Sequence, residues 1–191
     1  MTSHRIMKKP SGSFFLFGPR ATGKSTWLLN QCNPDYVVDL LKAKDFQRFS
    51  TNMSLLREIL EANPKFKSIV VDEIQKLPEL LDEIHSLIFE SNNKLQFILT
   101  GSSSRKLKNK NVNLLAGRAL LRNFHPYTCL EILPQFDLDL ALKYGMLPEV
   151  WNRPSIEDKK DYLISYVQTY LKEEIQQEAA VRSLPSYLSF L

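Results

Sequence analysis

Eight consecutive residues have the types and spacing that bind phosphate: Gly18-Pro19-Arg20-Ala21-Thr22-Gly23-Lys24-Ser25. They match the pattern G-x-x-x-x-G-K-[ST] in full, and Thr26 extends it. The glycines allow the backbone to turn so that successive N–H groups point into one concavity, an anion nest at the start of a helix. In this pattern Lys24 reaches the β- and γ-phosphates of a nucleotide, and the hydroxyl of Ser25 ligates Mg²⁺.

The alternative interpretation of this stretch is an ordinary strand-to-helix turn with two turn glycines. The flanking residues favour the phosphate-binding interpretation. The apolar run 14–17 precedes the loop as a buried strand, and residues 26–31 can form a helix that Lys24 opens. Strand, glycine-flanked loop and helix, in this order, are the context that the motif requires.

An acidic pair, Asp72-Glu73, follows a second apolar run at residues 68–71. We expect Asp72 to hold Mg²⁺, directly or through water, and Glu73 to polarise the water that attacks the γ-phosphate. Such a pair is common by chance after a strand. Its position at the carboxyl end of a strand, where ligands bind in open α/β sheets, favours these two roles.

Polar residues also follow the apolar run 95–99. Thr100 and Ser102 either contact the γ-phosphate or the attacking water, or they form a hydroxyl-rich turn that caps the next helix. The sequence leaves both alternatives open. A basic run comes next and consists of Arg105, Lys106, Lys108 and Lys110. Such runs are typical of solvated loops, with contact to nucleic acid or a partner as the weaker alternative.

Arg118 is a further candidate, because phosphoryl transfer gains greatly from an arginine supplied in cis or by a neighbouring chain. The residues alone do not decide whether its guanidinium reaches a nucleotide or pairs with a carboxylate.

Apolar runs that alternate with helical patterns predict an α/β fold, a three-layer parallel five-stranded sheet followed by a small helical region. The expected strands are residues 14–17, 36–40, 68–72, 95–100 and 119–124. The expected helices are residues 42–49, a helix with Thr51 as its N-cap, a helix with Pro78 as its first residue, a helix with Ser155 and Asp158 as a capping box, and residues 183–191.

Three parts of the chain follow from these patterns. Residues 1–12 are expected to be a flexible lead-in, residues 13–125 the nucleotide-binding core, and residues 126–191 a helical region, the start of a lid or of a missing C-terminal part. The apolar end Tyr187-Leu188-Ser189-Phe190-Leu191 either tucks into the domain or packs against a missing C-terminal part, and the second alternative is slightly favoured.

The composition is that of a soluble globular chain of 191 residues, with 43% hydrophobic and 24% charged residues. The net charge of +4 permits contact with nucleic acid but argues for it only weakly. Neither a secretory signal nor a membrane span is visible, so a cytoplasmic protein with no membrane partner is expected. Cys32 and Cys129 have no metal-site spacing and are predicted to be reduced, buried thiols.

As a set, these motifs resemble the AAA-type ATPases of bacteria and archaea that carry a C-terminal domain of unknown function. The matching stretches are Gly18–Ser25, Val71-Asp72-Glu73-Ile74-Gln75, Thr100–Arg105, Leu115-Ala116-Gly117-Arg118, Pro126-Tyr127-Thr128-x-x-Glu131 and Gly145-Met146-Leu147-Pro148-Glu149. The sequence departs from the family at Thr128, where serine is commoner, and at Tyr144, where the family usually has a glycine.

The resemblance implies a core that binds ATP and Mg²⁺, with Asp72-Glu73 as the second nucleotide motif. It further implies that Thr100–Ser102 are the sensor region and that Arg118 is an arginine finger or sensor. The family's C-terminal domain is expected to be absent from this sequence. The choice of ATP over GTP rests on the resemblance, supported by the lack of a visible [NT]-K-x-D motif.

The expected function is therefore Mg-dependent ATP hydrolysis coupled to a protein partner or an appended domain, with Glu73, Lys24, Thr100 and Arg118 as catalytic residues. The alternatives are an interaction module that binds ATP with little hydrolysis, and a kinase for a small molecule or nucleoside. The protein partner is unknown, nucleic acid is a weakly supported partner, and a homo-oligomer stays open.

Overall fold

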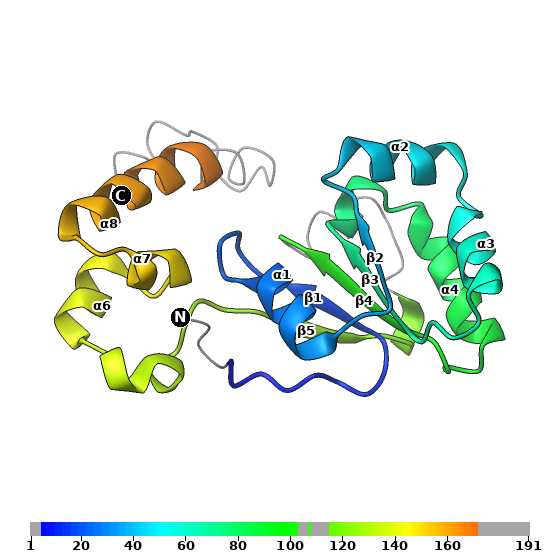
Figure 1. Ribbon diagram of the computed structural model, residues 1–191, viewed down its shortest axis with the longest axis horizontal. Coiled ribbons are helices and arrows are strands. Elements are labelled where there is room, and N and C mark those ends of the chain that lie inside the picture. The colour runs from blue at the N-terminus through cyan, green and yellow to red at the C-terminus, as the bar shows by residue number, and fades with distance from the viewer. Residues whose placement is uncertain (1–4, 103–106, 108–114, 172–191) are drawn as a thin grey trace. The chain divides into compact units, whose positions relative to one another are not determined.

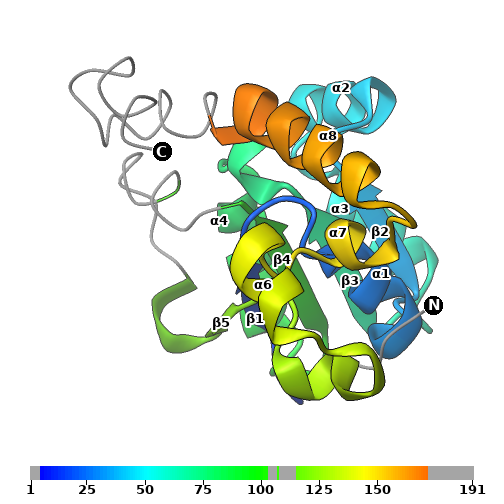
Figure 2. The same ribbon diagram turned by 90° about the vertical axis from the view of Figure 1, so that its left-hand side faces the viewer.

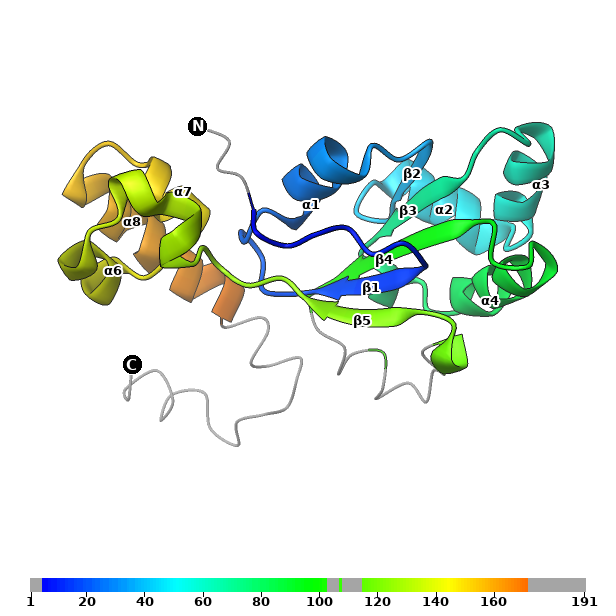
Figure 3. The ribbon, with the colours of Figure 1, turned by 90° about the horizontal axis from the view of Figure 1, so that it is seen from below.

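A parallel five-stranded β-sheet forms the centre of the part of the chain before residue 126 (Figure 1). The computed structural model describes residues 5–102, 107 and 115–171. The strands are β1 (Phe14–Phe17), β2 (Tyr36–Asp39), β3 (Ser68–Asp72), β4 (Gln96–Gly101) and β5 (Leu120–Asn123), in the spatial order β2-β3-β4-β1-β5. Figure 3 shows β5 beside β1 at one side of the sheet. Because every neighbouring pair is parallel, the carboxyl ends of all five strands lie at the same edge. The predicted α/β fold class is confirmed.

Helices cover both faces of this sheet, because alternate side chains of each strand point to opposite faces. On β1, Phe14 and Leu16 enter one buried cluster, and Phe15 and Phe17 enter the other. The first cluster is covered by α1 (Lys24–Trp27), which continues as a π-helix, η1 (Leu28–Cys32). The second is covered by α2 (Ala43–Thr51), α3 (Leu55–Ala62) and α4 (Leu80–Glu90). Each large side chain buried in this way contributes about 1.5–3 kcal/mol, which holds the strands in their layers.

Two expected helix starts are wrong. Thr51 does not cap a helix but is the last residue of α2, and the turn is made by Asn52, whose Oδ1 accepts from the N–H of Ser54 at 3.0 Å. Pro78 is not the first residue of a helix, since α4 begins at Leu80 after the short 3₁₀ helix η2 (Ile74–Lys76).

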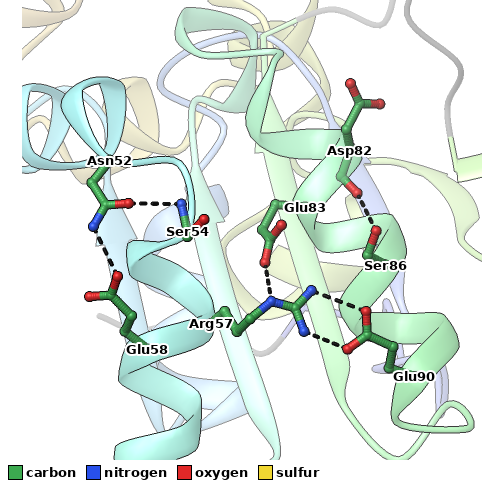
Figure 4. A network of polar contacts seen from close by, with 8 residues as sticks. All are labelled: Asn52, Ser54, Arg57, Glu58, Asp82, Glu83, Ser86 and Glu90. Carbon is green, nitrogen blue, oxygen red and sulfur yellow. Dashed lines mark hydrogen bonds and ion pairs between the residues drawn. The ribbon is translucent and has the colours of Figure 1, made fainter.

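An ion-pair network joins α3 to α4 (Figure 4). The Nε of Arg57 donates to Oε1 of Glu83 at 2.8 Å, and its two Nη atoms donate to the two carboxylate oxygens of Glu90. The hydrogen bond with Glu90 raises the pKa of Arg57, and the same contact lowers the pKa of the Glu90 carboxyl. The network therefore ties together two helices that cover the same face of the sheet.

Residues 126–171 form a second compact unit with residues 5–6 and 20–22, while residues 7–19 and 23–125 form the first. The helices of the second unit are η4 (Cys129–Gln135), α6 (Leu138–Tyr144), α7 (Pro148–Asn152), α8 (Ile156–Tyr166) and η5 (Val167–Leu171). Figure 2 shows α6 and α7 beside α8, which packs against both. Ser155 caps α8 as predicted, because its Oγ accepts from the N–H of Asp158 at 3.0 Å.

The N-terminal segment and the two cysteines differ in part from what the sequence predicts. Part of the predicted flexible lead-in makes specific contacts, because the amide of Gln96 donates to the carbonyls of Pro10 and Gly12, at 2.8 Å in each case. Cys32 is buried as predicted, and burial raises the pKa of its thiol to about 11. Cys129 is exposed, so the prediction of a second buried thiol is wrong.

The helix expected at residues 183–191 lies outside the described residues. Among the helices that are described, none has the length and apolar character that crossing a membrane requires.

Candidate functional site

The carboxyl edge of the sheet brings the predicted motifs together. The register pairs Phe17 with Gly101 and Val71 with Leu99. The loop after β1, the acidic pair at the end of β3 and the polar end of β4 are therefore neighbours, in a sheet where β4 lies between β1 and β3. This edge is where parallel α/β sheets bind their ligands.

The two glycines of the phosphate-binding pattern are required for different reasons. Gly23 has φ +87°, a left-handed conformation that side chains rarely adopt, and its carbonyl accepts from the N–H of Trp27 at 2.9 Å as α1 begins. Gly18 is needed for space, because a Cβ there would lie 2.0 Å from the carbonyl oxygen of Phe124. The first glycine therefore lets the loop pass close to the end of β5, and the second turns the chain into the helix.

We predict that Gly18→Ala lowers the free energy of unfolding by about 1–3 kcal/mol, the usual cost of overpacking. The clash is with backbone, which cannot swing aside as a side chain can. Thermal unfolding followed by circular dichroism measures the effect, with Gly12→Ala as the control, since a Cβ at Gly12 has no atom within 4 Å. Equal midpoints for the two variants would contradict the prediction.

Lys24 is a buried charge at the first residue of α1, with an exposed fraction of 7%. Its Nζ donates to the carbonyl of Gly18 at 2.6 Å and to that of Pro19 at 2.8 Å. The ammonium therefore lies inside the curve of the loop, where two carbonyl oxygens compensate its charge in place of water. An anion in this loop would meet a cation that is already in position.

Ser25 and Asp72 lie side by side, although 46 residues separate them in the sequence. The Oγ of Ser25 donates to Oδ2 of Asp72 at 3.2 Å. Thr100 donates to the other oxygen of Asp72, Oδ1. One carboxylate thus links the loop of β1 to the end of β4.

The chemistry of the Ser25–Asp72 pair suits Mg²⁺. This ion prefers oxygen ligands and usually takes one or two of them from protein, completing its shell with water and phosphate oxygens. Across the described residues there is no group of three or more His, Cys, Asp or Glu side chains that would form an all-protein metal cage. Residues Ser25 and Asp72 are therefore the ones that would hold the ion.

Glu73 has an unusual backbone for its type, with φ +59° and ψ +45°. A non-glycine residue in this left-handed region is uncommon, and such conformations cluster at functional sites. Its N–H donates to Oγ1 of Thr100 at 3.1 Å, and its carboxylate accepts a hydrogen bond from the amide of Gln75. The residue as a whole is 7% exposed. Glu73 is thus a fixed, largely buried carboxylate next to the predicted metal ligand.

Thr100 contacts the acidic pair, and its predicted contact with the γ-phosphate or the attacking water stays a prediction. Its hydroxyl bonds both members of the acidic pair, the N–H of Glu73 and the carboxylate of Asp72. Ser102 is buried beyond it, with an exposed fraction of 7%. Residues 103–106, which include the first part of the basic run, lie outside the described residues, as do Lys108 and Lys110.

Arg118 does not lie near the loop of its own chain. It comes two residues before Leu120, which pairs with Phe14 at the start of β1. The phosphate-binding loop follows the other end of β1, about 10 Å of strand away at roughly 3.3 Å per residue. At the amino edge the Arg118 guanidinium contacts the imidazole of His85 and lies 5.4 Å from the ring centre of Phe89, both on α4. A catalytic role in cis is therefore wrong, and a role toward a neighbouring chain stays a prediction.

The tip of the loop, residues 20–22, belongs to the second unit. The hydroxyl of Tyr166 donates to the carbonyl of Arg20 at 3.3 Å, and the Arg20 guanidinium lies 5.6 Å from the ring centre of Tyr170. Tyr166 is the last residue of α8, and Tyr170 lies in η5. They are partly exposed, and here they contact a residue of the phosphate-binding pattern.

Sequence reasoning did not single out Arg5, which also contacts the loop tip. Its Nη1 donates to the carbonyl of Thr22 at 3.1 Å, and its Nε lies 3.1 Å from Oε1 of Glu131. Desolvation by burial lowers the pKa of Arg5, and the charge of Glu131 opposes that shift. Glu131 also closes the capping box of Thr128 at the start of η4. Arg5 and Glu131 are far apart in the sequence, and no sequence pattern indicates that they pair.

Comparison with known proteins agrees with the motifs. A model of the AAA domain family matches residues 11–133, well over half of the chain. The chain belongs to the AAA domain family. The match begins before β1 and ends within η4, so it includes the loop, the acidic pair and Arg118 of this AAA domain.

Two mycobacterial proteins are similar to this AAA chain. The uncharacterized proteins Mb2031c of Mycobacterium bovis and Rv2008c of Mycobacterium tuberculosis are each 27% identical to it over 164 residues. These alignments cover 85% of this chain and 36% of each relative. The chain therefore spans about a third of the length of these relatives.

Among solved structures, AMPPCP-bound DnaA from Aquifex aeolicus is 17% identical, with a TM-score of 0.47, over 88% of this chain and 59% of that one. Domain III of the replication initiation protein DnaA from Thermotoga maritima is 13% identical, with a TM-score of 0.42, over 86% and 82% of the two chains.

Proposed function

We propose that this AAA domain binds Mg-ATP and hydrolyses it to ADP and phosphate, and that it couples this turnover to a partner or an appended domain. The observation that carries the proposal is the continuous set of contacts at the carboxyl edge of the sheet. Lys24 lies in the curve of the loop, Ser25 meets Asp72, and Thr100 bonds both Asp72 and Glu73. Membership of the AAA family supports ATP as the nucleotide.

Each of these groups has a defined task in the proposed reaction. The ammonium of Lys24 exchanges its carbonyl partners for β- and γ-phosphate oxygens and offsets their charge. The carboxylate of Glu73 accepts a proton from the water whose oxygen attacks the γ-phosphorus, while the bond from that phosphorus to the β-bridging oxygen breaks. The hydroxyl of Thr100 bonds the carboxylate of Asp72 and the backbone N–H of Glu73, which fixes the acidic pair at the end of β3.

Mg²⁺ held by Ser25 and Asp72 would neutralise charge on the phosphate oxygens. The hydrogen bond from Ser25 to Asp72, 3.2 Å long, keeps both oxygen ligands together. The residues at this position therefore fit the ion that the family uses.

Coupling is supported by the contacts of the loop tip within the second unit. Two side chains donate hydrogen bonds to carbonyls of the loop tip: Arg5 to that of Thr22, and Tyr166 to that of Arg20. A change in the loop on binding or releasing phosphate would alter these bonds, and with them the helical region that supplies Tyr166. Transmission through such a contact needs only a difference in bonding between the two states.

The test is phosphate release from ATP, measured with Mg²⁺ present and after its removal with EDTA. We expect turnover with Mg²⁺ and a fall to background without it, while ATP affinity falls less, because the loop and Lys24 still contact phosphate. An exposed variant such as Glu157→Gln, in the first turn of α8, serves as the control and should behave as the wild type. Turnover that persists unchanged in EDTA would contradict the proposal. ATP binding with no turnover under any condition would instead favour the non-hydrolysing interaction module.

A further inference from the structure

Gln75 lies beside Glu73 and has the chemistry to fix its carboxylate. It is the second residue of η2, directly after the left-handed turn at Glu73. Its Nε2 donates to Oε2 of Glu73. The opposite orientation of the amide would place Oε1 against a carboxylate oxygen, and two acceptors do not bond. The contact itself therefore requires the NH₂ group of Gln75 to face Glu73.

This orientation leaves the other end of the amide without a donor. Oε1 of Gln75 is buried, and none of the described residues donates to it. Buried carbonyl oxygens of this kind are normally hydrogen-bonded, and an exception calls for an explanation. The explanation here is that the contact of the NH₂ group with Glu73 decides the orientation of the side chain.

Strand β4 makes room for the amide at Gly101. A Cβ at that position would lie 2.4 Å from Oε1 of Gln75 and 3.3 Å from its carbonyl carbon. Gly101 lacks a positive φ, so space, not backbone conformation, is what the glycine provides here. The amide of Gln75 therefore lies between Gly101, at the end of β4, and the Glu73 carboxylate.

From these contacts we infer that Gln75 is a positioning residue for the proposed general base. Glu73 is held at its N–H by Thr100 and at Oε2 by Gln75, which leaves its second carboxylate oxygen, Oε1, to accept the proton of the attacking water. The role rests on the proposed hydrolysis, because it assigns to Gln75 the orientation of Glu73 in that reaction. Gln75 itself touches neither phosphate nor metal in this assignment.

The first test is Gln75→Met, which keeps the length of the side chain and removes its donors. We expect kcat for ATP hydrolysis to fall about 10-fold, as for a lost hydrogen bond to a charged group, with the Kd of Mg-ATP unchanged. Gln47→Met, at an exposed position of α2, makes the same chemical change elsewhere and should leave kcat unchanged. A kcat that stays the same or rises in Gln75→Met overturns the inference.

Gly101→Ala is a second variant, which keeps the glutamine at position 75 but fills the space that its amide occupies. It should lower kcat in the same direction as Gln75→Met, whereas Gly12→Ala should not. In a Glu73→Gln background the Gln75→Met change should no longer affect the residual turnover, because the two residues act through one carboxylate. An equal loss in both backgrounds would mean that Gln75 only supports the fold, and would overturn the positioning role.

A cycle on unfolding midpoints, without nucleotide, separates this inference from the proposed function. If the wild type has no turnover, the proposed function fails, but Glu73→Ala, Gln75→Met and the double variant, in which the contact is removed from either side, still report whether the two side chains are coupled. Non-additive shifts in the midpoint support the contact. Additive shifts overturn it, whether or not the chain hydrolyses ATP.

Discussion

Replacing Lys24 with alanine is expected to weaken the binding of Mg-ATP by about 100-fold, since each hydrogen bond from a charged group contributes roughly 1.5–3 kcal/mol. The ammonium lies against the carbonyls of Gly18 and Pro19, inside the curve that would receive the phosphates. Its loss removes the cation of the loop and leaves the two carbonyl oxygens facing the incoming anion. The affinity therefore falls through lost attraction and added repulsion together. Titration calorimetry with Mg-ATP measures it.

The control for this experiment is Lys94→Ala, which changes the net charge equally. Lys94 is exposed and comes two residues before β4 begins, at the amino edge of the sheet. Its loss should change the affinity less than about twofold, because an exposed charge far from the ligand is screened by salt. A thermal melt of both variants checks that the loop variant is folded. Equal affinities of Lys24→Ala and Lys94→Ala for Mg-ATP would show that the loop is not part of the binding site.

The strands could be predicted closely because their sequences carry strong local signals. Residues 14–17 and 68–72 are observed with the predicted bounds, since each is a short apolar run buried on both faces and followed by polar or glycine residues. Helix starts depend on finer competition. Thr51 has the right chemistry for a cap, but α2 continues through it, and Asn52 forms the turn instead.

Some residues of the candidate site could be placed from the sequence, and others could not. The loop and the acidic pair are contiguous motifs, and a parallel sheet places both at one edge, so their proximity followed from the predicted fold. Arg118 could not be placed from the sequence, because its position depends on the register of β5 with β1, which puts it at the opposite edge. Arg5 reaches Thr22 and Glu131 only through the folding of distant segments.

Gln75 shows a third case. It was visible in the motif Val71–Gln75, but nothing in the sequence indicates that a side chain two residues after Glu73 would turn back toward it. That geometry follows from the left-handed backbone of Glu73, a conformation that residue type does not predict.

Glu73→Gln is expected to lower kcat for ATP hydrolysis by 100-fold or more, in the range of about 10²–10⁴ that general bases contribute. The amide has nearly the same shape as the carboxylate but cannot accept the proton of the attacking water. Its contact with Gln75 persists with an amide oxygen in place of a carboxylate oxygen, so the turn at Glu73 should keep its structure. The affinity for Mg-ATP should stay within about twofold, because Glu73 is assigned to water and not to phosphate.

Steady-state phosphate release and equilibrium binding of ATP, measured on the same preparation, give both numbers, with the exposed Glu79→Gln as the matched control. The joint result with Lys24→Ala discriminates between the functions. Loss of binding at Lys24 and loss of turnover alone at Glu73 is the pattern of a hydrolase. A different pattern is expected of an interaction module that binds ATP with little hydrolysis. In that case Lys24→Ala loses binding, and Glu73→Gln leaves a slow background turnover unchanged. Transfer of phosphate to an added acceptor by the wild type, in preference to water, is the pattern of a kinase, and in that case Glu73 would activate the acceptor's hydroxyl by the same proton transfer.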